Sequence, residues 1–392
     1  MRIFVYEHVS GGGYAGKPLP AGVLAEGFAM LRCVVADFRA AGHEVTVLLD
    51  ERLAKVDAPT GANYNMQVLY AHEPKKFLQN AAKNYDAFYV IAPETGRVLE
   101  DFVKIVEGTG KTSLNCESEA IAQVSDKAAL IEALQKNGTQ TPKTLTLNVH
   151  DNSSDIEQKI KDALSYPLVF KPLDGTSCSG ISLLKNPTEI NAALNKIKKQ
   201  STNPQFLAQE YIQGTPASVS LICNGKKAAA ISLNKQQVNL TQPKCESSYL
   251  GGCVPLDHPL KQAAFGLVEQ VVEAFSGLRG YVGVDVVLGD KAVFVLDVNA
   301  RLTTSYVGLR QVADFNVAEA IINAAVGGKL PEKPKMRGIA CFEKTSIPKP
   351  ALGAYRRAIR VNGVVSPPFP LTDSTDAAAL IMGYGEMTPR RV

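Results

Sequence analysis

The sequence predicts an α/β protein in which an open parallel-sheet domain is followed by two α+β lobes. Strand-like and helix-like segments alternate over residues 1–117, and this alternation is typical of a parallel sheet covered by helices. Later segments are β-branched runs separated by turn residues. The 392 residues suffice for two or three domains. We expect units at 1–117, 118–208 and 209–335, followed by a small proline-rich extension at 336–392 that forms an appended cap with strands at 339–344 and 358–365.

The composition is that of an ordinary globular protein and excludes several classes. The net charge of +4 is small and dispersed, so we expect no nucleic-acid partner. No apolar run approaches about 18 residues, and the N-terminus lacks a signal-peptide core. We therefore expect a cytoplasmic protein without a membrane span. The seven cysteines are scattered, with no CxxC pair, so we expect reduced thiols.

The elements expected in the first unit are strands at 2–6, 45–49, 87–92 and 112–115 and helices at 22–41 and 98–106. Ligands of such sheets bind beyond the carboxyl ends of the strands. Glu7, His8, Glu94 and Asn115 fall there. This edge of the sheet is therefore where we expect substrate.

Two glycine-rich segments of this unit resemble nucleotide-binding motifs without the required context. Residues 11–16 match GxGxxG, but the helical pattern begins only near Gly22, so no helix N-terminus meets the motif. Residues 108–112 resemble the end of a P-loop, but a helix precedes and a strand follows, the reverse of that motif. A NAD-dependent oxidoreductase is therefore only an alternative, and a mobile loop over a cleft explains residues 11–16 better.

The second unit contains a lysine at the end of a strand, followed by a glycine- and serine-rich loop. Ser125 and Asp126 are typical helix caps, and Lys127 follows them. The strand at 168–172 includes Lys171 and leads into the loop at 173–181. Glycines and hydroxyls at this density allow backbone N–H groups to turn toward one anion. The loop predicts a phosphate clamp, with an ordinary hairpin loop as the alternative.

The segment 281–305 predicts a β-hairpin that carries acidic residues on otherwise apolar strands. Gly289-Asp290 separates the two β-branched runs. Asp297 and Asn299 share one face because side chains alternate along a strand, and antiparallel pairing can bring Asp285 to that face. Two carboxylates and an amide oxygen suit Mg²⁺, and Arg301 adds a cation for phosphate. The alternative is a surface hairpin with solvated acids.

Four separated segments of the sequence, in their order along the chain, resemble the ATP-grasp superfamily of carboxylate–amine ligases. They are Ser125–Lys127, Phe170–Pro172 with its loop, Gln209–Ile212, and Asp285 with Asp297–Arg301. The resemblance covers roughly residues 2–330. It implies an ATP-grasp fold with an N-terminal Rossmann-like domain, ATP between two lobes, and an amide bond formed through an acyl phosphate.

The resemblance also implies a role for each matching residue. The implied ATP-binding residues are Lys127, Lys171, Gly175, Ser177, Ser179, Gly180, Gln209, Glu210 and Ile212. The implied ligands of Mg²⁺, with Mn²⁺ as an alternative, are Asp285, Asp297 and Asn299. Arg301 and Lys171 would be catalytic, with Arg301 in contact with the transferring phosphate and Lys171 in contact with the phosphates of ATP.

This sequence departs from the family pattern at three places. Asp297 stands where Glu is usual, and Ala300 stands where proline is common. The resemblance implies that Glu210 and Ile212 offer backbone groups to the adenine edge. The acid that often follows this segment and binds ribose is absent, since residues 215–218 are Thr-Pro-Ala-Ser. The ribose contact is therefore unassigned.

Within the superfamily, the chain looks similar to the tyramine–glutamate ligases of methanofuran and methylofuran biosynthesis. The segments that carry this likeness are 5–7, 24–27, 30–31, 234–236, 249–252 and 301–306. The substrate-binding candidates are Glu7, Tyr249, Gly251, Gly252, Thr303 and Ser305. Small-molecule substrates are implied: glutamate, joined to tyramine or tyrosine. A dipeptide or purine-pathway ligase and a non-catalytic nucleotide-binding protein remain alternatives, and a homodimer remains open.

Overall fold

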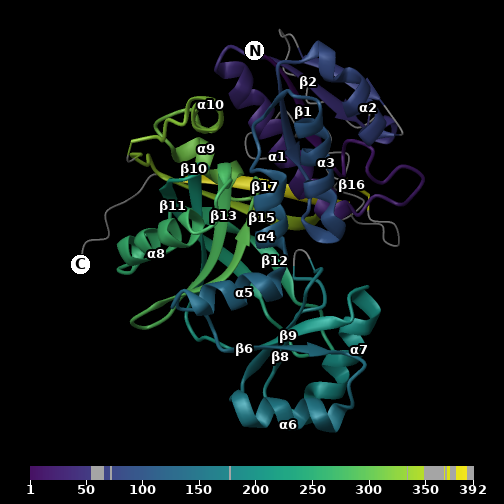
Figure 1. Cartoon of the computed structure of the whole chain (residues 1–392), viewed down its shortest axis with the longest axis vertical. Coiled ribbons are helices and arrows are strands. Elements are labelled where there is room, and N and C mark those ends of the chain that lie inside the picture. Colours follow the sequence, from purple (N-terminus) through teal and green to yellow (C-terminus); the bar gives the residue numbers. More distant parts are fainter. Residues whose placement is uncertain are drawn as a thin grey trace.

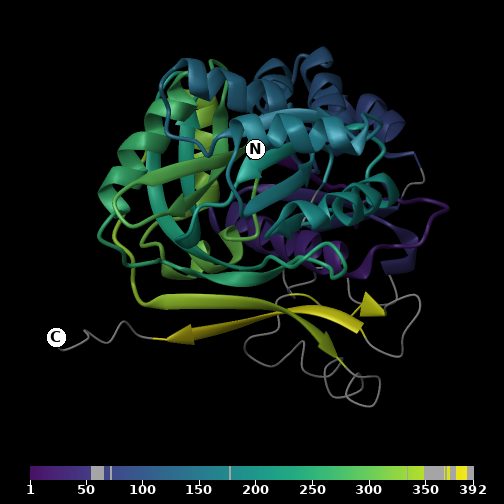
Figure 2. The ribbon, with the colours of Figure 1, turned by 90° about the horizontal axis from the view of Figure 1, so that it is seen from below.

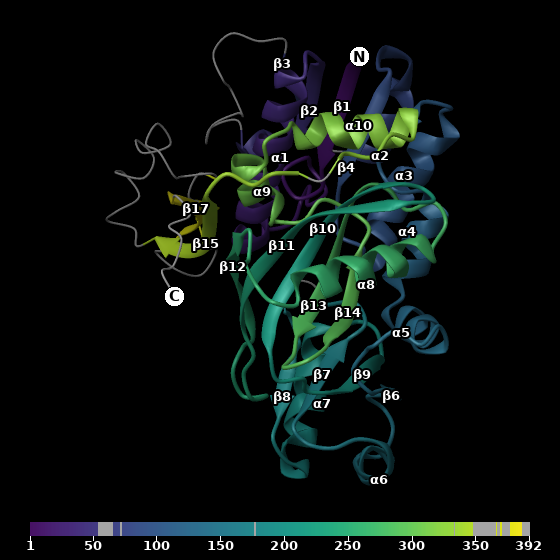
Figure 3. The same ribbon diagram turned by 90° about the vertical axis from the view of Figure 1, so that its left-hand side faces the viewer.

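The protein is described here from a computed structural model that covers residues 1–53, 66–70, 73–175, 178–332, 334–347, 366, 369–370 and 377–385. The described residues form three β-sheets, and Figure 1 shows them one above another: the N-terminal sheet in the upper part, the largest sheet in the middle and a small sheet in the lower part. Figure 3 shows the same order from the side.

The N-terminal sheet is parallel in every strand pair of the order β3-β2-β1-β4-β5, which confirms the predicted class. Its strands are β1 (Arg2–Glu7), β2 (Glu44–Leu49), β3 (Met66–Tyr70), β4 (Ala87–Ile91) and β5 (Thr112–Ser113), and its helices are α1 (Ala21–Ala40), α2 (Pro74–Ala81) and α3 (Val98–Gly108). Helix α1 begins well after residues 11–16, and α3 precedes β5. Neither glycine-rich segment therefore has the geometry of a nucleotide-binding motif.

The small sheet is antiparallel in the order β6-β9-β7-β8. Its elements are β6 (Thr144–Asn148), β7 (Leu168–Pro172), β8 (Ser182–Leu184), β9 (Gln205–Glu210), α6 (Ser153–Ala163) and α7 (Ile190–Gln200), preceded by α4 (Ser118–Ser125) and α5 (Lys127–Lys136). Helices α6 and α7 share one hydrophobic core with this sheet, which includes Ile156 of α6, Ile197 of α7 and Phe170 of β7. The expected unit boundary at 208/209 falls inside β9.

The central sheet has the order β14-β13-β10-β11-β12-β15-β17-β16. Its strands are β10 (Thr215–Asn224), β11 (Ala228–Asn239), β12 (Ser248–Val254), β13 (Arg279–Leu288), β14 (Val293–Asn299), β15 (Ile339–Ile347), β16 (Phe369–Pro370) and β17 (Ala377–Gly385). Its helices are α8 (Lys261–Glu273), α9 (Tyr306–Val312) and α10 (Val317–Gly327). Strands β13 and β14 form the predicted hairpin, with Asp285 directly opposite Asp297.

The C-terminal extension continues this sheet rather than forming an appended cap. Strand β15 pairs with β12 and β17 pairs with β15, and Figure 2 shows β15 and β17 as a long strand pair along one side of the molecule. The strand expected at 339–344 is present and runs to Ile347. The strand expected at 358–365 lies outside the described residues.

The expectation of reduced thiols is wrong for two of the cysteines. Cys253 of β12 and Cys341 of β15 form a disulfide across 88 residues of sequence. The two residues face each other in the strand pairing, and scattered sequence positions could not reveal that contact. The other five cysteines are free.

The N-terminal domain packs on the central sheet through α1. One continuous core contains Phe28 and Phe38 of α1 together with Leu309 of α9 and Ile321 of α10. Asp37 of α1 adds a polar anchor, accepting from Arg310 Nε at 2.9 Å and from the Tyr306 hydroxyl at 2.6 Å. Among the described residues, no helix has the length and apolar character needed to cross a membrane.

Candidate active site

A cavity of about 1040 Å³ opens where the three sheets meet, and residues of all three line it. The N-terminal domain supplies residues that follow β1 and β4, the small sheet supplies β7 with its loop, and the central sheet supplies the β13–β14 hairpin. A cavity of this size and position, with few but convergent charged groups, is the default place for a ligand site.

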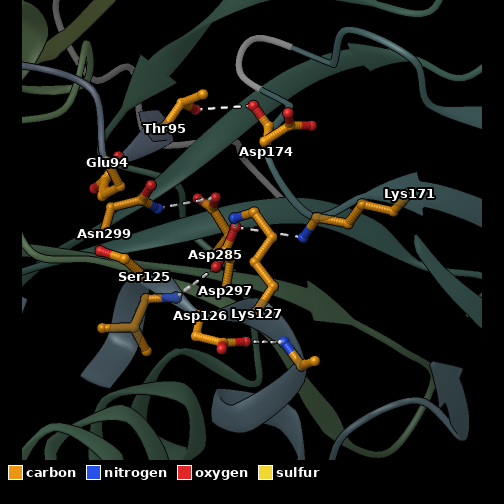
Figure 4. A network of polar contacts seen from close by, with 12 residues as sticks. Glu94, Thr95, Ser125, Asp126, Lys127, Lys171, Asp174, Asp285, Asp297 and Asn299 are labelled. Atoms are coloured by element: carbon orange, nitrogen blue, oxygen red, sulfur yellow. Dashed lines mark hydrogen bonds and ion pairs between the residues drawn. The ribbon is translucent and has the colours of Figure 1, made fainter. Parts of the chain in front are cut away.

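Asp297 is the point at which two predicted lysines converge. Its Oδ2 accepts a short hydrogen bond from Lys127 Nζ and a second bond from Lys171 Nζ at 3.3 Å (Figure 4). Asp126 accepts from the amides of Ala128 and Ala129, caps α5 and thereby fixes Lys127 in the first turn. The structure thus brings together residues separated by 170 and 126 positions in sequence.

The charges around Asp297 shift the pKa of each partner. Burial alone would raise the pKa of Asp297, but the two ammonium groups outweigh it and hold this pKa at about 2. Burial lowers the pKa of Lys127, yet the adjacent carboxylate reverses the effect and leaves it raised. The pKa of Lys171 is lowered, because burial and the charge of Lys127 outweigh the more distant contact with Asp297.

Asp285 has a different set of partners. Its two oxygens accept from Gln236 Nε2 at 2.8 Å and from Asn299 Nδ2 at 3.1 Å. Burial and the negative charge of Asp297 raise the pKa of Asp285 above its usual value. Two facing carboxylates are therefore distinguished by their surroundings, one held by cations and the other by neutral amides.

Arg301 connects the hairpin to the N-terminal domain. Its Nε donates to Glu94 Oε2 at 2.8 Å, and its Nη2 lies 3.4 Å from Asn299 Oδ1. Glu94 follows β4 at the carboxyl edge of the N-terminal sheet. The sequence predicts this acid at that edge but does not predict its pairing with Arg301, because nothing local links positions 94 and 301.

The glycine- and serine-rich loop is only partly at the cavity. Gly175 and Cys178 line it, whereas Gly180 N and Ser179 Oγ bond to Gln200 at 2.6 and 3.2 Å. Ser177 lies outside the described residues. The role of this loop in binding phosphate stays a prediction.

The remaining residues expected to bind ATP also differ in whether they reach the cavity. Gln209 and Ile212 line the cavity. Glu210 holds the small sheet together, since its amide donates to Lys143 O at 2.9 Å and its carboxylate accepts from Ser165 N at 3.3 Å. Its expected contact with the nucleotide stays a prediction.

Among the substrate-binding candidates, Glu7, Tyr249, Thr303 and Ser305 line the cavity. Gly251 and Gly252 belong to β12 and pair with β15. A side chain at Gly251 would approach the Phe342 carbonyl oxygen to 2.1 Å, so the glycines allow close strand packing.

The carboxylate of Glu7 finds its hydrogen-bond donors in the turn that follows β1. Its oxygens accept from Val9 N at 3.1 Å, Ser10 N at 2.7 Å and Ser10 Oγ at 2.5 Å, and the residue is 3% exposed. Burial raises the pKa of Glu7 although these hydrogen bonds oppose the shift. The carboxylate thus has a structural function in the turn, and its contact with an amine, expected from the sequence, becomes the alternative that a substitution must decide.

Glu26 also lines the cavity, although the sequence did not indicate it as a site residue. Glu26 of α1 accepts from Thr304 Oγ1 at 3.0 Å and from Lys344 Nζ of β15 at 2.9 Å. Glu26 lies in the segment 24–27 that carried the family likeness, so that segment was the available signal. Lys344 lies in the extension, to which the sequence assigned no function.

The donor set fits a hard divalent cation. Asp285, Asp297 and Asn299 offer two carboxylates and an amide oxygen, and the donors that contact Asp285 are both uncharged amides, so a nearby cation would stabilise this carboxylate. Within the described ranges, no group of three His, Cys, Asp or Glu side chains gathers as a metal site. The amide of Asn299 would therefore complete the set.

Comparison with known proteins identifies the family of this chain. The ATP-grasp domain family matches residues 124–305, and the pre ATP-grasp 3 domain family matches residues 43–121. A tyramine–L-glutamate ligase of Methanocaldococcus jannaschii is 31% identical over 65% of this chain and 67% of the relative. Its counterpart from Methanocaldococcus fervens is 30% identical over 67% of this chain and 75% of the relative.

A solved structure shares the fold over nearly the whole chain. The biotin carboxylase domain of Hydrogenobacter thermophilus 2-oxoglutarate carboxylase, in complex with MgADP, has a TM-score of 0.72 at 12% identity, covering 98% of this chain and 86% of that one. The fold and these matches together define an ATP-dependent ligase that joins a carboxylate to an amine. The chain belongs to the ATP-grasp family.

Proposed function

We propose that this ligase joins glutamate to tyramine, or to a closely related phenolic amine such as tyrosine. The observation that carries the proposal is the similarity to two tyramine–L-glutamate ligases over about two thirds of the chain. The cavity is compatible with such an amine, because Tyr14, Val23, Met30 and Tyr249 supply aromatic and apolar surface for a ring.

The chemistry explains why the site is rich in charge. A carboxylate is a poor acyl donor because its leaving group would be oxide. Phosphorylation by ATP gives an acyl phosphate whose phosphate leaves easily, and an amine then forms the amide. Phosphoryl transfer requires positioning and charge neutralisation rather than a protein nucleophile.

The residues of this site would divide that work. Lys127 and Lys171 would bind the phosphates of ATP, and Arg301 would bind the transferring phosphate, since planar guanidinium groups match phosphate oxygens. Asp285, Asp297 and Asn299 would hold Mg²⁺, which supplies neutralisation of charge at the phosphate oxygens. Thr95 Oγ1 donates to Asp174 O at 2.9 Å, so contact between the N-terminal domain and the loop after Lys171 would help to exclude water from the acyl phosphate.

The test measures ADP release by the purified protein with ATP, Mg²⁺ and glutamate against a panel of amines. Tyramine or tyrosine should give amine-dependent ADP release and an amide product of the expected mass. Turnover confined to other amines, such as non-phenolic amino acids or peptides, would contradict the proposed acceptor. Turnover with another carboxylate and not with glutamate would contradict the proposed donor.

A further inference from the structure

Glu94 is a cavity-lining acid that the reaction outlined above does not use. One oxygen, Oε2, accepts from Arg301 Nε at 2.8 Å. The other, Oε1, is buried and has no hydrogen-bond partner in the described parts of the chain. The side chain is 14% exposed and lines the cavity. An unpaired buried carboxylate oxygen is costly, so a ligand donor at this position would stabilise it.

The other glutamates that line the cavity have both oxygens engaged by protein donors. Glu7 is held by Val9 and Ser10 in its own turn. The carboxylate of Glu26 accepts from Thr304 and Lys344. That of Glu100 accepts from Arg97 and Lys104. Within the described residues, Glu94 differs from these three in having one oxygen left for a ligand.

The position of Glu94 places its side chain at the Arg301 end of the cavity. Arg301 links Glu94 to Asn299, and Asn299 links onward to Asp285; Figure 4 shows Glu94 beside Asn299. The next residue, Thr95, contacts the loop that follows Lys171. Glu94 is thus held where the N-terminal domain meets both the hairpin and the small sheet.

An amine substrate needs such a group. At neutral pH an alkyl amine is an ammonium, which requires an anionic partner in an enclosed site and must lose a proton before it can attack. General bases lie within hydrogen-bond reach of the proton that they remove. The anion must also lie near the acyl phosphate, and the Arg301 end of the cavity meets that condition.

We propose that Glu94 Oε1 binds the ammonium of the amine substrate and accepts its proton, an inference that rests on the proposed ligase reaction. Proton transfer gives a neutral amine and a protonated Glu94. The nitrogen lone pair then forms the C–N bond at the acyl carbon, and the C–O bond to phosphate breaks. The second nitrogen proton leaves with the phosphate, so the products are the amide and hydrogen phosphate.

The test separates the two half-reactions with hydroxylamine, which is weakly basic and mostly uncharged at neutral pH. Hydroxylamine traps an acyl phosphate as a hydroxamate without first losing a proton to the enzyme. In E94Q the amide oxygen can still accept from Arg301, but the proton acceptor is removed. We expect E94Q to form hydroxamate from glutamate and ATP at near the wild-type rate, while its kcat/KM for tyramine falls by roughly 10²-fold or more.

The exposed E73Q, which breaks a surface pair with Lys76, is the matched control and should retain both products. Loss of hydroxamate and amide together in E94Q would show that Glu94 acts through Arg301 in the first half-reaction, and would overturn the proposal. Unchanged amide formation would overturn it as well. Wild-type enzyme that gives no hydroxamate with glutamate would instead refute the proposed substrate, and the inference with it.

Discussion

The candidate site has two halves, each built around an aspartate, and the two aspartates have different neighbours. In the lysine half, Asp297 is held by Lys127 and Lys171 and its pKa is about 2. In the amide half, Asp285 faces Gln236 and Asn299 and its pKa is raised. The two carboxylates are direct partners in one hairpin, so strand geometry does not distinguish them. The difference comes from the donors that face each carboxylate. Asp297 meets two lysines from distant segments, whereas Asp285 meets Gln236 of β11 and Asn299 of its own hairpin.

Asp297→Asn tests the lysine half and should have the largest effect. Because two buried ammonium groups would lose their counterion, we expect a loss of roughly 3 kcal/mol in unfolding free energy. We also expect turnover to fall by about 10²–10³-fold, as when a charge-stabilising group is removed. ADP release and melting temperature measure the two effects. The exposed Asp290→Asn in the same hairpin is the control, and near-normal turnover in Asp297→Asn would refute the metal assignment.

Asp285→Asn tests the amide half. Turnover should fall by about 10²-fold, but the pH dependence of stability should change in the opposite sense from that of Asp297→Asn. The pKa of Asp297 lies below the usual 3.8 in the folded state, so its stabilisation is present above pH 3.8 and is lost as pH falls toward about 2. The pKa of Asp285 is raised, so its ionisation destabilises the fold as pH rises above 3.8.

Denaturant melts of both variants between acid and neutral pH, without nucleotide, measure these slopes. In the wild type, Asp285 lowers stability as pH rises toward neutral, and Asp285→Asn should abolish that decrease. Asp297 lowers wild-type stability as pH falls into the acid range, and Asp297→Asn should abolish that decrease. Parallel profiles for the two variants would show that the halves are not distinct.

Lys171→Ala sharpens the comparison within the lysine half. Lys171 makes the longer contact with Asp297, and its pKa is lowered, so its removal should disturb the nucleotide-free fold less than removal of Lys127. We expect ATP affinity to fall by about tenfold, equivalent to about 1.4 kcal/mol. ATP-dependent thermal stabilisation measures it, with the exposed Lys198→Ala as control. Equal shifts in the two variants would defeat the assignment.

Glu7→Gln extends the comparison to a carboxylate whose donors all lie in its own turn. An amide cannot accept all three hydrogen bonds, so we expect a loss of about 1 kcal/mol in stability with an unchanged KM for the amine. Melting temperature and steady-state kinetics separate the two, with the exposed Glu44→Gln as control. A raised amine KM at an unchanged melting temperature would assign Glu7 to the substrate.

Features that depend on neighbouring residues in the sequence could be predicted, whereas features that depend on contacts between distant segments could not. The hairpin and its acidic face followed from period-two alternation and the Gly289-Asp290 turn. The convergence of Lys127 and Lys171 was implied only by the family likeness. The Cys253–Cys341 disulfide depends on pairing between distant strands. Glu94 keeps one oxygen without a protein donor whereas Glu7 has donors for both, and this difference depends on which residues fold against each carboxylate. Sequence position indicates where an acid lies but not which of its lone pairs are occupied.

Strand β15 lies beyond residues 124–305, which match the ATP-grasp domain, and this has a practical consequence for shortened versions of the protein. Removal of residues from 336 onward would leave the backbone groups of β12 unpaired along an open edge, which is a template for pairing with other chains. It would also remove Lys344 and leave the carboxylate of Glu26 without its cation. We expect such a fragment to aggregate, so the ATP-grasp segment would not be obtained as an independent soluble unit by cutting there.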